Sequence, residues 1–176
     1  MRGVLLDRDG VINDVVLREG KPYPPPSVGS LAILPGVAAT LRRLRDAGLR
    51  VIVVTNQPDV GTGRQRREVV DAMHRRLLGE LAIDAIKTCF HTDDDACACR
   101  KPRPGMLLAA AREWELDLGA SYMVGDRWRD VGAGRAAGCR TFWIDRGYRE
   151  RAPDSPDHVV RSLEEAGRII LQEASP

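Results

Sequence analysis

The chain has 176 residues, a length that suits one domain with its own hydrophobic core. Apolar residues make up 43% and charged residues 30%, as in globular proteins, and no apolar run approaches the roughly 20 residues that cross a bilayer. A formal charge of +2 does not require a nucleic-acid partner. We therefore expect a single domain over residues 1–176, cytoplasmic and monomeric, with no membrane or nucleic-acid partner.

Short apolar runs rich in Val, Ile and Leu recur along the chain and are typical of buried strands. They cover residues 3–6, 49–54, 85–90, 122–124 and 141–144. Segments with helical spacing lie between and after them, at 37–47, about 66–81, 104–114, 129–137 and 162–172. Because parallel strands need crossovers long enough to hold a helix, this alternation predicts an α/β fold with a doubly wound parallel sheet.

Two stretches fit neither class. Residues 17–30 contain "KPYPPPSVGS", which has too many prolines for a helix or a central strand and predicts a loop or flap. The other is "CFHTDDDACACRKPRPG", over residues 89–105, where we interpret the aspartates at 93–95 as solvated loop residues. We interpret His74, within a predicted helix, as a surface or packing residue.

The second stretch carries a candidate metal site. Its pattern is Cys-x-His-x5-Cys-x-Cys, formed by Cys89, His91, Cys97 and Cys99. Three thiolates and one imidazole are a ligand set that favours tetrahedral Zn²⁺. Since the protein would fill all four positions, no place remains for a reactive water, and the sequence predicts a structural zinc that stabilises this loop.

Acidic side chains follow two of the predicted strands. Asp7 and Asp9 come after the first strand, and Asp126 and Asp130 come after the fourth. In open parallel sheets, ligands bind at the carboxyl ends of the strands, so these side chains would meet at one edge. They would repel one another unless a cation lay among them, and oxygen ligands favour Mg²⁺. For Asp130, a role as the cap of the following helix remains open.

Polar and basic side chains follow the second and third predicted strands. Thr55, Asn56 and Gln57 come after the second strand, and Arg100 and Lys101 follow the cysteine cluster after the third. Lys101 can hold phosphate oxygens as a point charge, and Thr55 can do so as a neutral donor. Together with the acids, these residues predict a phosphoryl-transfer site.

Four segments carry a family resemblance that covers essentially the whole chain. "LLDRDG", "VVVTNQ", "RKP" and "MVGDRWRD" resemble the ordered motifs of the haloacid dehalogenase (HAD) superfamily of phosphatases. Within it, the Cys/His cluster is similar to that of a branch that includes heptose bisphosphate phosphatases and histidinol-phosphate phosphatases. "CRKPRPGMLLAA" and "SYMVGD" resemble the heptose enzymes, whereas the five residues between His91 and Cys97 resemble the histidinol enzymes.

The resemblance implies a HAD-like Rossmannoid phosphatase. The stretches between the first and second motifs and between the second and third are too short for a separate cap domain, so we expect an open cleft. The reaction that the resemblance implies is Mg²⁺-dependent hydrolysis of a phosphorylated sugar, namely the 7-phosphate of heptose 1,7-bisphosphate, with histidinol phosphate as the alternative substrate. A non-enzymatic zinc-stabilised binding module is a more distant alternative, but such a protein would be expected to lose Asp7 or Asp9 first, and both are present.

Residue roles also follow from the resemblance. Asp7 would attack phosphorus and form an aspartyl-phosphate, and Asp9 would act as general acid and base. Thr55 and Lys101 would stabilise the phosphoryl oxygens. The Asp7 carboxylate, the Asp9 main-chain carbonyl and Asp126 would hold Mg²⁺. The expected substrate-binding residues are Arg8, through its backbone N–H, and Asn56, Gln57, Arg100 and Arg127.

Overall fold

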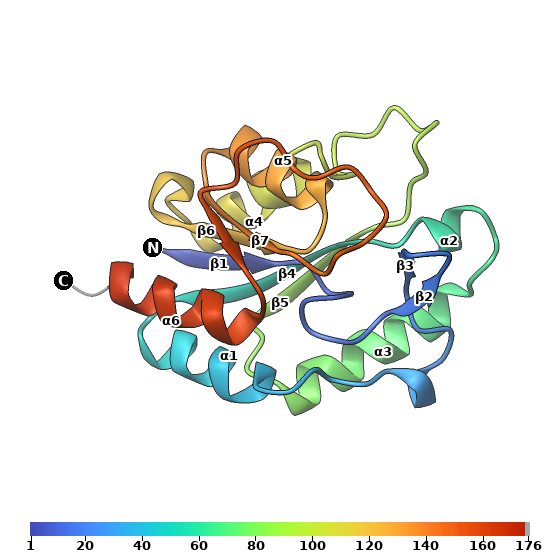
Figure 1. Cartoon of the computed structure of the whole chain (residues 1–176), viewed down its shortest axis with the longest axis horizontal. Helices are drawn as coiled ribbons and strands as arrows, with labels where there is room; N and C mark the ends of the chain where they lie inside the picture. The colour runs from blue at the N-terminus through green and yellow to red at the C-terminus, as the bar shows by residue number, and fades with distance from the viewer. Residues whose placement is uncertain (175–176) are drawn as a thin grey trace.

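A parallel sheet of six strands forms the middle layer of the protein, which the computed structural model describes over residues 1–174 (Figure 1). The spatial order of the strands is β5-β4-β1-β6-β7-β8. Every neighbouring pair is parallel. The bounds are β1 Gly3–Leu6, β4 Arg50–Asn56, β5 Ala85–Cys89, β6 Tyr122–Gly125, β7 Arg140–Ile144 and β8 His158–Val160.

The strand order runs outward in both directions from β1. The chain passes from β1 to β4 and β5 on one side, then returns to β6, β7 and β8 on the other. In doubly wound sheets, the crevice at such a reversal point is where ligands bind. Asp7, directly after β1, therefore lies where this topology places a site.

Helices cover both faces of the sheet (Figure 1). One face carries α1 (Val37–Asp46), α3 (Arg67–Glu80) and α6 (Leu163–Ala174), and the other carries α4 (Gly105–Trp114) and α5 (Trp128–Ala137). Side chains alternate between the faces, as the pleat of a strand requires. Val4 and Leu6 of β1 enter the core beneath α1 and α6, and Leu5 enters the core beneath α4. The three remaining helical pieces are short: η1 Val28–Ser30, α2 Pro58–Gly61 and η2 Leu118–Ala120.

The predicted strands and long helices agree with the structure to within about two residues at each end. The main difference is β8, which falls in a segment that carried no strand signal. Its three residues pair with β7 from Phe142 to Ile144 and extend the sheet by one strand. A run of three residues is too short for alternation to be distinguished from chance.

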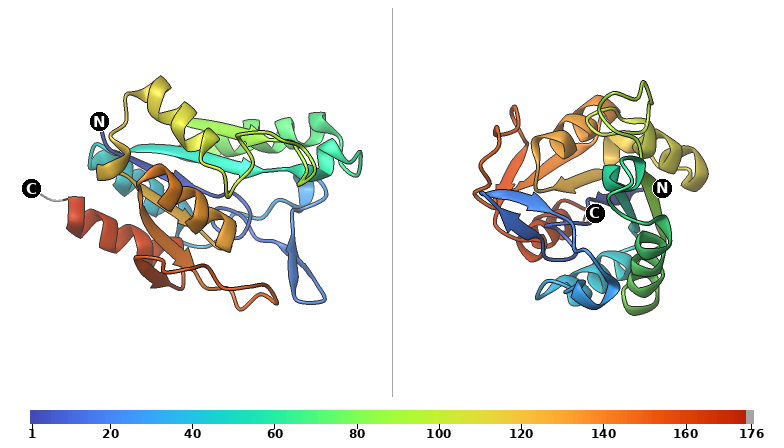
Figure 2. Two further views of the ribbon diagram at one scale, coloured as in Figure 1. Left: turned by 90° about the horizontal axis from the view of Figure 1, so that it is seen from above. Right: turned by 90° about the vertical axis from the view of Figure 1, so that its right-hand side faces the viewer.

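The proline-rich flap predicted at 17–30 begins as an antiparallel hairpin and ends in η1. Strands β2 (Val16–Arg18) and β3 (Lys21–Tyr23) are joined by Glu19 and Gly20, both at positive φ, as tight hairpin turns require. The hairpin is a separate sheet and stands apart from the main one (Figure 2). Apart from these elements, only α1 lies between β1 and β4, and only α2 and α3 lie between β4 and β5, so no separate cap domain exists within residues 1–174.

None of the helices in residues 1–174 has the length and hydropathy needed to span a bilayer.

Candidate active site

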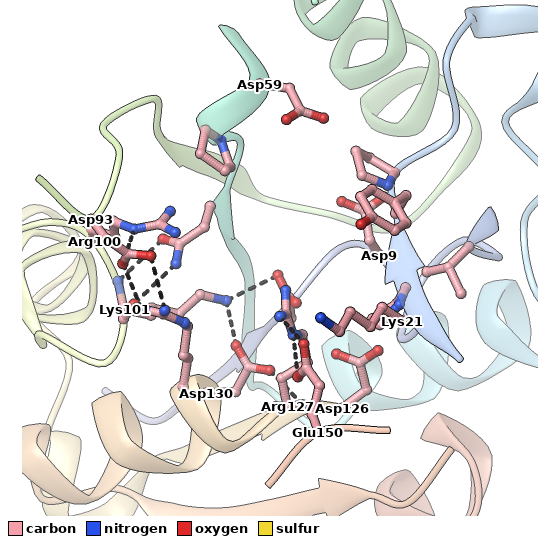
Figure 3. A pocket seen from close by; sticks show the side chains of 18 residues that line it. Asp9, Lys21, Asp59, Asp93, Arg100, Lys101, Asp126, Arg127, Asp130 and Glu150 are labelled. Carbon is pink, nitrogen blue, oxygen red and sulfur yellow. Dashed lines mark hydrogen bonds and ion pairs between the residues drawn. The ribbon is translucent and has the colours of Figure 1, made fainter. Parts of the chain in front are cut away.

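A cavity of about 270 Å³ lies at the carboxyl ends of the strands (Figure 3). Side chains that follow β1, β4, β5 and β6 line one side, and the β2–β3 hairpin lines another. The expected site residues that line it are Asp7, Asp9, Asn56, Arg100, Lys101, Asp126 and Arg127. The cavity is also lined by Asp130, and by Lys21, Tyr23, Asp59, Asp93, Arg129 and Glu150, which sequence reasoning did not assign to the site.

The ammonium group of Lys101 lies between two carboxylates. Its Nζ is 2.9 Å from Asp7 Oδ1 and 2.6 Å from Asp130 Oδ1, and it donates to the carbonyl of Val54 at 2.7 Å. Burial alone would lower the pKa of Lys101, but Asp130 and Asp7 more than offset burial, so the pKa is raised. Lys101 is therefore a fixed positive charge beside the Asp7 carboxylate.

Asp130 fills the capping role that the sequence left open and also pairs with Lys101. Its Oδ1 accepts from Lys101, and its Oδ2 accepts from the backbone N–H of Arg127 at 2.9 Å, which caps the start of α5. One side chain therefore connects the first turn of this helix to the buried ammonium.

Three carboxylates gather at the base of the cavity. Oxygens of Asp7, Asp126 and Asp130 lie within 4.8 Å of one another, and all three residues are buried. Burial and the neighbouring acids raise the pKa of Asp7 to about 6 although Lys101 opposes them, and they raise the pKa of Asp126 well above its usual range. Asp126 Oδ2 accepts from the Tyr148 hydroxyl at 2.8 Å, whereas buried Asp126 Oδ1 has no hydrogen-bond partner among the described residues. This unpaired oxygen among crowded acids fits a divalent cation.

The Asp9 side chain is held by a different set of neighbours. Its Oδ1 accepts from Arg8 and from Asn13 at 2.9 Å, and its Oδ2 accepts from Gln57 at 2.8 Å. Asp9 lines the cavity but is not part of the cluster formed by Asp7, Asp126 and Asp130. The two aspartates of "DRDG" therefore occupy different surroundings, as expected of two acids with different tasks.

Three expected site residues lie behind the cavity wall. The side chains of Arg8, Thr55 and Gln57 are buried and do not line the cavity. Gln57 Nε2 donates to Thr55 Oγ1 at 2.9 Å as well as to Asp9, so its amide joins the β4 end to the acid. For Arg8, only the backbone is left to contact a substrate, as the sequence interpretation had assumed.

The side-chain amide of Asn56 orients the backbone of Lys101. Asn56 donates to the carbonyl of Lys101 and accepts from its N–H, both at 3.1 Å. This reciprocal pair fixes the backbone that carries the buried ammonium.

The cavity rim carries arginines that are paired with acids. Asp93 accepts from Arg100 at 2.9 Å and from Arg129 at 2.9 and 3.1 Å, and Arg127 pairs with Glu150. The hydrogen bond from Arg100 lowers the pKa of Asp93 to about 2. The expectation for Asp93 was therefore only partly correct, because it is exposed in a loop but bonded to two arginines. Its partner Arg129 lies on another element, and such a contact leaves no mark in local spacing.

Lys21 of the hairpin is the other cation at the rim. Its side chain points into the cavity near Asp126 and Asp9 (Figure 3). No ion pair involving it is found within residues 1–174. The sequence signal that could have placed Lys21 at the site is a basic side chain within the predicted flap.

The Cys/His residues form a compact cluster after β5. The Cys89 and Cys97 sulfurs are 3.9 Å apart, the Cys89 and Cys99 sulfurs are 2.9 Å apart, and His91 Nδ1 is 3.2 Å from Cys99 and 3.5 Å from Cys89. Two sulfurs at about 2.3 Å from one tetrahedral metal would be roughly 3.8 Å apart. All four cysteines of the chain are free thiols. The ligand types and the Cys89–Cys97 separation fit a tetrahedral metal ion, whereas the Cys89 and Cys99 sulfurs lie closer together than such an ion would hold them.

Comparison with known proteins identifies the family. The HAD-hydrolase-like family matches residues 98–166. The D-glycero-beta-D-manno-heptose-1,7-bisphosphate 7-phosphatase of Bordetella bronchiseptica is 36% identical over 99% of this chain and 100% of its own length. The enzyme of the same name from Escherichia coli K12 is 30% identical over 98% of this chain and 95% of its own. The chain belongs to this family of HAD phosphatases.

Solved structures agree with this assignment. The crystal structure of the B. bronchiseptica D,D-heptose 1,7-bisphosphate phosphatase, complexed with magnesium and phosphate, has a TM-score of 0.83 at 33% identity and covers 98% of this chain and 99% of its own. That of the Burkholderia thailandensis enzyme has a TM-score of 0.69 at 29% identity, covering 97% and 99%. The fold and the phosphoric monoester hydrolase class predicted from the sequence are thereby confirmed.

A glycine-to-alanine change at position 10 tests how tightly the loop after β1 packs on the acid cluster. Gly10 has φ +79°, and a Cβ there would lie 1.8 Å from Asp126 Oδ2, which Tyr148 holds in place. We expect Gly10→Ala to lower the free energy of unfolding by roughly 2 to 4 kcal/mol in thermal or urea melts. Gly29→Ala is the matched control, because a Cβ at position 29 would lie 4.0 Å from its nearest neighbour, the Ser27 hydroxyl oxygen. Equal stability of both variants would show that this loop is not closely packed.

Proposed function

We propose that this chain is a Mg²⁺-dependent phosphomonoesterase that removes the 7-phosphate of D-glycero-D-manno-heptose 1,7-bisphosphate. The observation that carries the proposal is the Asp7 carboxylate, which lies 2.9 Å from a buried lysine within an acid cluster at the reversal point of the sheet. Full-length similarity to enzymes named for this reaction supports the same conclusion. The single-domain organisation over 1–176, the monomeric state and the cytoplasmic location stay predictions.

Asp7 is the nucleophile in this proposal. Its carboxylate oxygen attacks phosphorus, the bond from phosphorus to the sugar oxygen breaks, and an aspartyl-phosphate forms. Lys101, held by Asp130 and the Val54 carbonyl, offsets the negative charge of the transferring group. Thr55 would assist at the phosphoryl oxygens once its hydroxyl, now accepting from Gln57, turns toward them.

Asp9 supplies and removes the protons. As a general acid it protonates the departing sugar alkoxide, and as a general base it then takes a proton from the water that hydrolyses the aspartyl-phosphate. Asp9 lies at the cavity wall, two residues after Asp7 in the sequence, and this place suits both steps.

The cation in this proposal is Mg²⁺. The Asp7 carboxylate, Asp126 and the Asp9 main-chain carbonyl would hold it, and the orphaned Asp126 Oδ1 is the oxygen best suited to it. When bound, the ion supplies a positive charge that stabilises the transferring phosphoryl group.

The rim of the cavity favours a bisphosphate as substrate. Lys21, Arg100 and Arg127 line it and would bind a second phosphate, Arg100 and Arg127 by exchanging their present partners Asp93 and Glu150 for it. Asn56 would contact the sugar. Although the short spacing within the cysteine cluster resembles the histidinol enzymes, the full-length similarity to enzymes named for the heptose reaction favours the heptose substrate.

A structural zinc completes the proposal. Cys89, His91, Cys97 and Cys99 would hold Zn²⁺ in a loop whose backbone otherwise lacks regular structure. The same loop carries Asp93 and leads into Arg100, so the metal would fix one side of the substrate-binding rim.

Substrate choice and the nucleophile can be tested together. We expect kcat/KM for heptose 1,7-bisphosphate to exceed that for histidinol phosphate by at least about tenfold.

Asp7→Asn should lower kcat by roughly a thousandfold or more, because an amide oxygen is a poor nucleophile. Asp46→Asn, on the exposed end of α1, is the control and should retain full activity. Faster cleavage of histidinol phosphate would reject the substrate, and full activity of Asp7→Asn would reject the nucleophile.

Mg²⁺ should stabilise the protein in a pH-dependent way. The folded pKa of Asp7, about 6, lies above its usual 3.8, so metal-free stability falls as pH rises between these values. Mg²⁺ needs the ionised form, so its stabilising effect should appear above this window. At a hundredfold excess over its dissociation constant, Mg²⁺ should raise Tm by roughly 5 to 10 °C at pH 7.5. The rise should be much smaller at pH 4.5, with NaCl of equal ionic strength as the control. Equal rises at both pH values would contradict the site.

The zinc content of the purified protein tests the cysteine cluster. We expect about one zinc per chain by atomic absorption, and a large loss of zinc and of thermal stability in Cys99→Ser. Cys139→Ser removes a buried thiol outside the cluster and should keep the zinc. A Cys99→Ser protein with undiminished zinc would show that these residues do not form the metal site.

A further inference from the structure

Arg8 is an unusual residue to find beside an active site, because its whole side chain is buried and none of it lines the cavity. A buried guanidinium needs partners for its donors, since it stays protonated in any protein environment. Two partners take them up. Nε and Nη2 donate to the carboxylate of the adjacent Asp9 at 3.0 to 3.2 Å, and Nη1 lies 3.0 Å from Nε2 of His74.

The chemistry of this contact fixes the state of His74. Arginine can only donate, so Nε2 of His74 must be the acceptor, and the ring proton must be on Nδ1. Burial, followed by the nearby Arg8 charge, lowers the pKa of His74 to about 4, while Asp9 and Asp71 act weakly in the opposite direction. The imidazole is therefore neutral near pH 7 and presents a lone pair to the guanidinium.

We propose that His74 is a positioning residue of the phosphatase reaction: it fixes the Arg8 guanidinium, which in turn holds the Asp9 carboxylate in place for proton transfer. The proposal rests on the proposed function, because it concerns Asp9 as general acid and base. His74 itself touches neither the cavity nor the acid cluster. It acts from the middle of α3, on the other side of Arg8.

The physical basis is the hydrogen-bonding demand of a buried arginine. Without an acceptor at position 74, Nη1 would be left unpaired in the interior, which is unfavourable. Arg8 would shift toward another acceptor and lose its hydrogen bonds to the Asp9 carboxylate. The neutral donors Asn13 and Gln57 would remain, but they do not replace the charged partner. A displacement of about 1 Å in a catalytic group can cost about a hundredfold in rate.

Three variants separate positioning from packing. His74→Leu fills much of the space but removes the acceptor. His74→Gln restores a side-chain oxygen near the place of Nε2 and is the conservative rescue. Met73→Leu, at the neighbouring buried position of α3, conserves volume and controls for general disturbance of the helix.

The assay compares two leaving groups. The phenolate of p-nitrophenyl phosphate departs without a proton, whereas a sugar alkoxide needs one from Asp9. Since kcat/KM reports the steps up to departure of the leaving group, His74→Leu should lower kcat/KM for a phosphorylated sugar about 10- to 100-fold. The value for p-nitrophenyl phosphate should change by less than about threefold. His74→Gln should recover to within about fivefold of the parent, and Met73→Leu should match the parent.

The outcomes distinguish the proposal from its premise. An equal loss of kcat/KM on both substrates, no loss in His74→Leu, or no recovery in His74→Gln would overturn the role of His74. A parent protein that hydrolyses neither ester would instead contradict the proposed function, and the proposal with it.

A second measurement is independent of activity. In ¹⁵N-histidine spectra of the parent protein, His74 should show a protonated Nδ1 and an unprotonated Nε2 at pH 7. A proton on Nε2 would contradict the contact with Arg8 whatever the kinetics show.

Discussion

The ion pair between Lys101 and the buried carboxylates of Asp7 and Asp130 is the interaction on which the site depends. Buried acids at this density are unfavourable without positive charge among them, and one ammonium cannot offset three carboxylates. Burial, and then the neighbouring acids, raise the pKa values of Asp7 and Asp126, and one oxygen of Asp126 has no hydrogen-bond partner among the described residues. A divalent cation and an arriving phosphate are the charges that such a site is built to receive.

The sheet supplies the rigidity that this arrangement needs. The ends of β1, β4 and β6 place the acids and amides within hydrogen-bonding range, and the close pairing of these strands leaves them little freedom. Around this rigid base lie less regular parts, namely the β2–β3 hairpin and the cysteine loop. They bring Lys21 and Arg100 to the cavity rim. In the proposed reaction, the ends of strands hold the reacting groups, while loops carry the residues that would meet the rest of the substrate.

The sequence predicted the features that repeat locally. Short apolar runs located the five longer strands, and the residues after them contained Asp7, Asp126 and Lys101. The four-ligand spacing located the metal cluster. Strand β8 and the hairpin strands were missed because each has only three residues, and β8 in addition owes its pairing to β7, 14 or more residues earlier in the chain. The contacts of Asp93 with Arg129, of Asp126 with Tyr148 and of Arg8 with His74 could not be predicted, since each joins residues far apart in the chain.

The central claim is that Asp7 is transiently phosphorylated, and trapping the intermediate tests it most directly. The enzyme would be mixed with substrate and Mg²⁺, quenched in acid within milliseconds and treated with borohydride, which reduces an aspartyl-phosphate to homoserine. Mass spectrometry of the N-terminal peptide should find homoserine at position 7 and aspartate at position 9. Turnover that leaves Asp7 unmodified, or that modifies another carboxylate, would contradict the account.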